Sequence, residues 1–467
     1  MRLGIRNPRR STNVLLPPEQ SELTKAILSN KPDLVRRLLE IRAVVAAAAA
    51  ANASSASSSS SSTTPAITYS TASTICTTTA GTTTDTAAAV GNLPSSSEQR
   101  VITDPDERTH LHLACFFKYK DIAQLLLDAG LPVNARDTDW TSPLHRACYA
   151  NAFEIVELLL SRGACPQLRD REWLSPLHIC AANDSFDCLK LLIQAGVTID
   201  LVDKNGASAL HHAANSGFLR VAVYLLEKGA DAKLRDNAGR QPLHYAAANG
   251  DKDMIHLLLP YVSSPDVPDS DGHTPAMIAA ACCEASALKT LLEVGAQIDA
   301  QDKLGYTALH HASERGYVMI TSLLLSLNAP LNMRTRTGLS ALHLCCSTNV
   351  GGLVLKALAP HLDQLPIDCV DQYQRTPLHL ATKCGVLSRI SDLLLIGANP
   401  NAVDILGRTP LHYAVQMRHF DAVEELLSSR SAKANIQDDT GMTALHYAAI
   451  NGDPGKSTID YDLIFPY

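Results

Sequence analysis

A short pattern returns along the chain at a nearly fixed spacing, and it restricts the fold more than any other feature. In most copies it reads Ser or Thr, then Pro or Ala, then Leu and His, as in "SPLH" and "TALH". The spacing is 33 residues through the eighth copy and 33 to 36 afterwards. The copies end at His112, His145, His178, His211, His244, Met277, His310, His343, His379, His412 and His446. Repeats of this length form stacked units without one closed core.

Each repeat predicts two short helices. The Ser or Thr can cap a helix, and the proline after it fits the first helical position, so "PLHRACYA" from Pro143 predicts a first helix. "FEIVELLLSRG" from Phe153 has apolar residues at helical spacing and predicts a second helix that ends at Gly163. Most repeats have a glycine at this end, and one has Asn328, which also tolerates a left-handed helix cap.

These motifs resemble the ankyrin repeat over residues 104–453. The resemblance implies an all-α repeat fold: an ankyrin-repeat solenoid of paired helices with β-hairpin fingers, in which eleven repeats follow one another and the last is incomplete. An earlier segment, "ELTKAILSNKPDLVRRLLE" from Glu22, predicts one further degenerate helix pair that caps the array over residues 20–42.

Three segments fall outside this repeat pattern. Residues 1–19 predict a disordered tail, and residues 43–103 a disordered Ala/Ser/Thr linker with few large apolar residues. We expect the linker to be an inert spacer, with a phosphorylated regulatory arm as the alternative. Residues 454–467 do not continue the repeat, because no second helix follows His446. We therefore expect a truncated form of a longer array, and otherwise a tail that folds back as a cap.

Composition limits the classes of function. A net charge of −7 does not indicate a general nucleic-acid binder, and no run of 18 apolar residues predicts a membrane span. The twelve cysteines contain no CxxC pair, and most lie on expected helices, which favours reduced thiols in the core. We therefore expect a location in the cytoplasm or the nucleus.

No motif in the sequence predicts chemistry. The anchor histidines, those that end the repeated pattern, are expected to make structural hydrogen bonds rather than to hold a metal. The doublets His211–His212 and His310–His311 each predict one additional exposed histidine, without a carboxylate or thiol recurring at ligand spacing. "GDPGKST" from Gly452 lacks the glycine spacing of a phosphate loop. We expect no enzyme, metal, cofactor or small-molecule substrate.

The two tryptophans of the chain mark the candidate binding surface. "DTDWTSPLHRA" and "DREWLSPLHIC" place Trp140 and Trp173 where the next two repeats have Gly206 and Gly239. The ankyrin resemblance implies that both lie at finger tips, beside a concave groove that binds partners. Aromatic residues dominate the energetics of protein interfaces. The alternative is that each tryptophan packs on the neighbouring finger and stiffens the array.

Other aromatic residues and a rim of charges complete this candidate site. We expect the aromatic side chains at the groove end of the first helices and the charges around them, a mixture that suits a protein surface better than a phosphate backbone. The candidate partner-binding residues are Phe116, Phe117, Asp139, Trp140, Arg146, Tyr149, Arg171, Glu172 and Trp173.

The units that carry the tryptophans, followed by "DKNGASALHHAANSG", also resemble the early repeats of the regulatory ankyrin repeat subunits of serine/threonine protein phosphatase 6. This second resemblance implies a scaffold that links a phosphatase complex to its substrates. The Ala/Ser/Thr insertion and the shorter array depart from that family. The alternatives are another adaptor, such as a membrane-skeleton ankyrin fragment or a ubiquitin-ligase substrate receptor, and the ankyrin part of a larger enzyme or channel.

Overall fold

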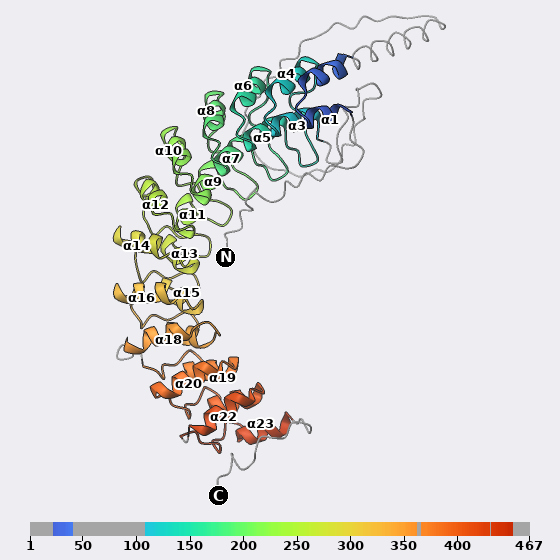
Figure 1. The fold of residues 1–467 in the computed structure, drawn as a ribbon. Coiled ribbons are helices and arrows are strands. Elements are labelled where there is room, and N and C mark those ends of the chain that lie inside the picture. The colour runs from blue at the N-terminus through green and yellow to red at the C-terminus, as the bar shows by residue number, and fades with distance from the viewer. Residues whose placement is uncertain (1–21, 41–107, 362–365, 430, 452–467) are drawn as a thin grey trace, which may run out of the picture. The chain divides into compact units, whose positions relative to one another are not determined.

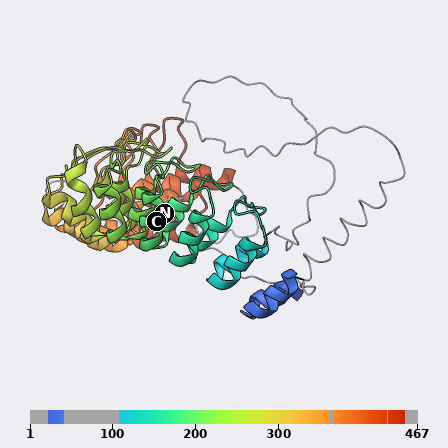
Figure 2. The ribbon, with the colours of Figure 1, turned by 90° about the horizontal axis from the view of Figure 1, so that it is seen from above.

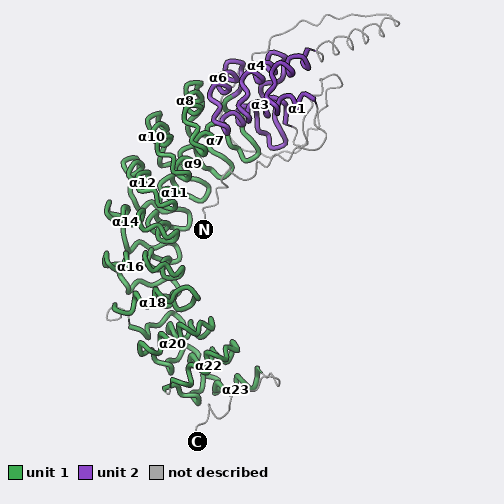
Figure 3. The backbone as a smooth tube through the Cα atoms, viewed as in Figure 1, with its two compact units in different colours: residues 1–12, 166–467 green, residues 13–165 purple. Residues whose placement is uncertain are grey.

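The computed structural model describes residues 22–40, 108–361, 366–429 and 431–451. The chain divides into two compact units (Figure 3). Unit 2 comprises Asn13–Cys165, and unit 1 comprises Pro166–Tyr467 together with Met1–Thr12. Each unit is described by itself. The tail, linker and C-terminal segment expected from the sequence lie outside the described residues.

Unit 2 contains three pairs of helices. A helix over residues 32–40 follows α1, and α1 packs on α3, where the Thr24 hydroxyl lies 3.1 Å from Nε2 of His110. Helices α3 and α5 pack side by side, as do α4 and α6. The named helices are α1 (Glu22–Leu28), α3 (His110–Phe116), α4 (Lys120–Asp128), α5 (Pro143–Tyr149) and α6 (Phe153–Ser161).

Unit 1 continues the alternation of first and second helices. The first helices are α7 (Pro176–Ala182), α9 (Ala209–Ser216), α11 (Pro242–Ala248), α13 (Pro275–Cys282), α15 (Ala308–Glu314), α17 (Ala341–Cys346), α19 (Pro377–Cys384), α21 (Pro410–Gln416) and α23 (Ala444–Ile450). The second helices are α8 (Phe186–Gln194), α10 (Leu219–Glu227), α12 (Lys252–Leu258), α14 (Ala285–Glu293), α16 (Val318–Ser326), α18 (Gly352–Leu358), α20 (Leu387–Ile396) and α22 (Phe420–Ser428). Short 3₁₀ turns, Leu259–Tyr261 and Ala359–His361, extend α12 and α18.

Within unit 1 most helices pack on the helix of the same kind in the next repeat. First helices pack on first helices, as in α7 with α9 and α9 with α11, and those from α7 to α21 also pack on the second helix of their own repeat. In Figure 1 the two kinds form two rows, and in Figure 2 the loops of unit 1 gather along one edge of the stacked helices. This is the all-helical repeat architecture that the sequence predicts.

The start of each first helix explains the repeated histidine. Ser142 precedes α5, and its backbone N–H donates to Nδ1 of His145 over 3.1 Å. The N–H of His145 points back to the Ser142 hydroxyl at 3.4 Å, so the two residues cap one another. Most first helices repeat this reciprocal arrangement, which makes the histidine a structural part of the turn.

The ends of the second helices confirm the predicted stop signals. Gly163 follows α6 with φ +82°, and Asn328 follows α16 with φ +59°. Both lie in the left-handed region, where glycine is free of strain and asparagine is tolerated.

An aspartate closes most fingers in the same way, and Thr335 takes its place in one of them. Asp203 Oδ1 accepts the backbone N–H groups of Asn205 and Ala207, both over 2.8 Å, and its own N–H donates to the Ala207 carbonyl over 2.9 Å. Within the described residues, β-structure is limited to an isolated bridge between Val202 and Ser208. The fingers are therefore side-chain-stabilised turns rather than extended hairpins.

Most cysteines of the described residues are buried, as expected, and none of those residues forms a disulfide. Cys345 and Cys346 fill the core of α17, and burial raises the pKa of Cys346 well above its usual value. Cys283 departs from the pattern, because it is exposed and occupies a left-handed cap with φ +68°. No helix within the described ranges is both long and apolar enough to span a bilayer.

Replacing Gly239 by alanine should destabilise the array more than the same change at Gly229. Both glycines have positive φ, +74° and +90°, so either alanine carries a strain of about 1–2 kcal/mol. A Cβ at Gly239 would also lie 2.7 Å from the backbone N of Ser270 in the next finger, whereas nothing lies within 4 Å of one at Gly229. We expect Gly239→Ala to cost about 1–3 kcal/mol more in urea unfolding. Equal losses would show that adjacent fingers are not held at fixed spacing.

Candidate functional site

Trp140 occupies a strained turn in unit 2. Its φ is +62°, a conformation that costs a non-glycine residue about 1–2 kcal/mol. The backbone N–H of Trp140 donates to the Asp137 carbonyl over 2.8 Å, which holds the turn. The indole is 50% exposed, and the guanidinium of Arg136 lies 5.5 Å from its ring centre. The side chain is thus presented to solvent with a cation beside it.

The carboxylate of Asp137 holds this turn in place through hydrogen bonds. Its Oδ1 accepts the N–H of Asp139 and of Thr141, while Oδ2 accepts from Arg146 over 2.7 Å. Burial raises the pKa of the Asp137 carboxyl, but the hydrogen bonds from Thr141 and Arg146 outweigh it and leave the pKa below its usual value. Arg146 is therefore committed to a buried carboxylate, and its contribution to the site is to hold this turn.

Trp173 repeats the arrangement in unit 1. Its φ is +61°, its N–H donates to the Asp170 carbonyl over 3.0 Å, and the ring is 52% exposed. Arg169 stands over the indole at 5.5 Å from the ring centre. Both tryptophans thus replace glycine at a position that favours glycine, and both leave about half of the ring in solvent.

A cluster of four half-buried aromatic residues lies in unit 2, three of which the sequence singled out. Phe116 contacts Phe117 edge-on, with ring centres 5.2 Å apart, and stacks on Tyr149 at 6.1 Å. Tyr119 adds a stacked contact with Phe117 at 5.8 Å. Aromatic pairs in such geometries gain about 0.5–1.5 kcal/mol beyond their burial.

The charged residues expected around the tryptophans are largely at the surface. Asp139, Arg171 and Glu172 are exposed. Glu172 forms a long ion pair with Lys204, 3.8 Å between Oε1 and Nζ, and its carbonyl accepts the N–H of Lys204 over 3.0 Å. Exposed pairs of this kind add little stability, so these charges remain available to a partner.

The anchor histidines are buried, except for His446, which is exposed. In unit 2, Nε2 of His112 lies 2.9 Å from the Thr141 carbonyl of the next finger, and His211 and His379 make the same kind of contact in unit 1. Burial lowers the pKa of His178 to about 3 and that of His211 to about 4. These residues tie one repeat to the next, as expected for a structural role.

The second histidine of each doublet differs from the expectation that it is exposed and lacks a carboxylate partner. His212 is 3% exposed, and its Nε2 lies 3.0 Å from Oδ2 of Asp203. The side chain of His311 is 12% exposed, and its Nε2 lies 3.2 Å from Oδ2 of Asp302. In both doublets the aspartate of the finger lies nine positions before the second histidine, which is on the helix that follows the finger. That regularity in the sequence could have revealed both pairs.

Sequence reasoning also missed Tyr119, Arg136 and Arg169. The two arginines each precede a tryptophan by four residues, and this shared spacing is the signal that could have identified them. Each guanidinium lies 5.5 Å from the centre of an indole, close enough for a cation–π contact at the surface.

A family model described as ankyrin repeats (3 copies) matches most of the chain. The matched segments are residues 86–170, 177–269, 243–335, 320–404 and 387–456. Together they cover well over half of the 467 residues.

Curated relatives match shorter segments. Rabankyrin-5 of Homo sapiens is 41% identical over 69 residues, 15% of this chain and 6% of that protein. A putative E3 ubiquitin-protein ligase of Arabidopsis thaliana, XBAT31, is 35% identical over 94 residues, 18% of this chain and 21% of that protein. The B-cell lymphoma 3 protein homolog of Mus musculus is 33% identical over 89 residues, 18% of this chain and 20% of that protein. The chain thus spans between 6% and 21% of the length of these relatives.

Proposed function

Because the chain belongs to the ankyrin repeat family, we propose that it is a non-catalytic scaffold that captures other proteins through exposed side chains, among them Trp140 of unit 2 and Trp173 of unit 1. The observation that carries this proposal is the exposure of both indoles at backbone positions that favour glycine. A strained residue persists where the surrounding structure holds it and often marks a functional site.

The partner is a polypeptide rather than a nucleic acid. The tryptophans are accompanied by acidic as well as basic groups, namely Asp139, Arg171 and Glu172. A phosphate backbone would meet repulsion from the carboxylates, whereas a protein surface can pair with both signs around an apolar centre.

We further propose that this scaffold is a regulatory subunit of a protein phosphatase 6 type complex that carries substrates to a catalytic subunit. The support is the resemblance of the two tryptophan repeats, and of the unit that follows them, to that family. A second candidate is an adaptor of a ubiquitin ligase, and it is favoured by the 35% identity over 94 residues to XBAT31. Cytoplasm or nucleus is the location we propose for either role.

Affinity purification distinguishes the two roles. The full chain is used as bait beside a chain in which both tryptophans are alanine, and bound proteins are identified by mass spectrometry. A serine/threonine phosphatase catalytic subunit that binds the parent chain and not the variant supports the first role. A ubiquitin-ligase component with the same dependence supports the second. Proteins that bind both baits equally would contradict the tryptophan surface.

A further inference from the structure

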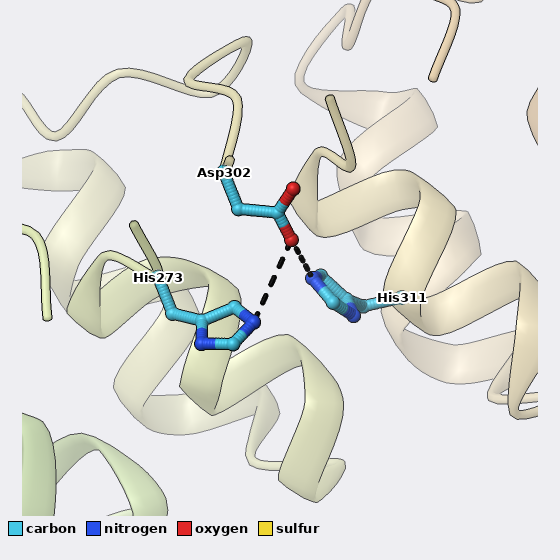
Figure 4. Close-up of side chains that lie close together, drawn as sticks. All are labelled: His273, Asp302 and His311. Carbon is cyan, nitrogen blue, oxygen red and sulfur yellow. Dashed lines mark hydrogen bonds and ion pairs between the residues drawn. The ribbon is translucent and has the colours of Figure 1, made fainter. Parts of the chain in front are cut away.

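We propose that His273, Asp302 and His311 form a binding site for a divalent transition-metal ion, most suitably Zn²⁺. All three belong to unit 1, where His273 and Asp302 come from adjacent fingers and His311 from α15 (Figure 4). Each offers one ligand atom, and these three atoms lie within 4.8 Å of one another. Two imidazoles and one carboxylate are a ligand set that Zn²⁺ takes with water in the fourth position.

The carboxylate is held ready by its own turn. Oδ1 of Asp302 accepts the N–H groups of Leu304 and Tyr306, both over 2.8 Å, so Oδ2 is left to face the histidines. Asp302 is 7% exposed. An orientation fixed by two backbone hydrogen bonds removes much of the entropy cost of gathering ligands.

The neighbouring finger holds His273 at a fixed distance from this carboxylate. The N–H of Lys303 donates to the Asp271 carbonyl over 3.0 Å, and its Nζ reaches the Ser270 carbonyl. Gly272 lets the two turns approach this closely, because a Cβ there would lie 2.8 Å from the N of Lys303. The two fingers thus form one rigid frame for the ligands.

His273 presents a lone pair to the site. Its Nδ1 lies 3.2 Å from Oδ2 of Asp269, and since a carboxylate only accepts, Nδ1 must carry the proton. In the neutral ring Nε2 then directs a lone pair toward Oδ2 of Asp302, 3.5 Å away. Two lone pairs that face each other repel, and either a proton on Nε2 or a metal ion between the two atoms removes this repulsion. A carboxylate bonded to the far nitrogen is also the usual outer partner of a metal-bound histidine.

The spacing fits tetrahedral coordination. Bonds of 2.0–2.2 Å in a tetrahedron place neighbouring ligand atoms about 3.4 Å apart. Oδ2 of Asp302 lies 3.5 Å from Nε2 of His273 and 3.2 Å from Nε2 of His311. The remaining edge, between the two nitrogens, is at most 4.8 Å long and would have to shorten when a metal binds.

A proton is the competitor for this position. The hydrogen bond to Asp269 raises the pKa of His273 most, and the charges of Asp302 and Asp271 add to the effect, although burial opposes them. To bind a metal through Nε2, a neutral His311 ring must move its proton to Nδ1. Only a charged imidazole ring gives up a proton when the metal binds, and to that extent metal binding strengthens as pH rises. The three aspartates around two histidines give the pocket a net negative charge that attracts a dication.

The repeat register shows that this cluster is specific to one interface. The first ligand, His273, lies four residues after Asp269, the aspartate of its finger. The second ligand is Asp302, the aspartate of the next finger, and the third, His311, lies nine residues after Asp302. Asp203 has His212 nine positions later but Leu174 at the first position, so one imidazole is missing there. Among the repeats that the structure describes, only the finger of Asp302 combines both histidines.

Metal titration of the full chain tests the proposal. With cysteines kept reduced, Zn²⁺ is titrated by calorimetry at pH 7.5, and Co²⁺ serves as a spectroscopic probe of four-coordinate binding. We expect one ion per chain. His273→Gln and Asp302→Asn should each weaken binding at least tenfold, since loss of even an outer partner costs about 10–100-fold. Asp302→Asn retains the oxygen that accepts the two backbone N–H groups. His256→Gln, at an exposed histidine of α12, should change nothing.

A gain-of-function variant separates ligand loss from misfolding. Leu174→His introduces an imidazole beside Asp203 and His212 in the register of His273, and Asp170 is placed to hold its far nitrogen. The stoichiometry should rise from one ion to two. Three results would each overturn the proposal: no saturable binding by the parent chain, undiminished affinity in His273→Gln and Asp302→Asn, or an unchanged stoichiometry for folded Leu174→His. None of these outcomes depends on whether a protein partner binds.

Discussion

Lowering the pH from 7.5 to 5.5 should destabilise the repeat array by about 8 kcal/mol. Burial lowers the folded-state pKa of six anchor histidines, to about 3 for His178 and to about 4 for His211, His244, His310, His343 and His379. In the unfolded chain the pKa is about 6.5. At pH 5.5 each of these histidines therefore lowers the free energy of unfolding by about 1.4 kcal/mol, because the unfolded chain binds a proton that the folded chain does not.

The sign of this effect follows from the geometry of the anchors. Nδ1 accepts a backbone N–H, as in Ser208 to His211 over 3.1 Å, and in His211 Nε2 donates to the Arg240 carbonyl of the next finger. Protonating Nδ1 would remove the acceptor and place a charge in the core. The stabilisation is fully present above pH 6.5 and is lost as pH falls toward 4. His273, whose pKa is raised, acts in the opposite direction, but it is a single half-buried group.

Urea unfolding at a series of pH values measures this loss, and calorimetry in buffers of different ionisation enthalpy counts the protons taken up on unfolding. We expect about six protons at pH 5.5. The repeat of α13 has Met277 at the anchor position and provides an internal comparison. The free energy of local opening, measured by hydrogen exchange, should depend least on pH in this repeat. Equal stability at pH 7.5 and 5.5 would contradict the assignment of neutral anchors.

The array could be predicted because its information is local and repeated. The cap at Ser142, the stop at Gly163 and the apolar faces of the helices each depend on a few adjacent residues. Agreement among many copies then removes the ambiguity of any one of them. The family model and the structure confirm this part of the interpretation.

The contacts between repeats were harder to foresee. The side chain of a finger aspartate bonds to the residue four positions later, to a side chain of the helix that follows, or to both. That partner is Arg146 for Asp137, Tyr245 for Asp236 and His212 for Asp203. A motif search treats those positions as exposed and variable. The cluster at Asp302 was missed for the same reason, since its ligands come from two fingers and a helix.

Changing Trp140 and Trp173 together to alanine should abolish capture of the partner. Loss of a central aromatic residue typically costs about 2–4 kcal/mol of binding free energy, or about 30- to 1,000-fold in affinity for each residue. Helical content should change little, because both residues lie in turns with rings half in solvent. Quantitative pull-down of the partner, together with circular dichroism and thermal unfolding, measures both properties. Tyr373→Ala is the control, since Tyr373 is a 47% exposed aromatic residue on a finger remote in sequence.

Glycine variants separate binding from stability at the same two positions. With φ near +60°, glycine relieves a strain that alanine retains, so the double Trp→Gly chain should be more stable than the double Trp→Ala chain by about 1–2 kcal/mol per site. Both chains lack the indoles and should fail equally to bind. A partner affinity that rises with the stability of the variant would instead mean that the tryptophans act by stiffening the fingers. Equal loss of binding at unequal stability leaves the exposed rings themselves as the contact.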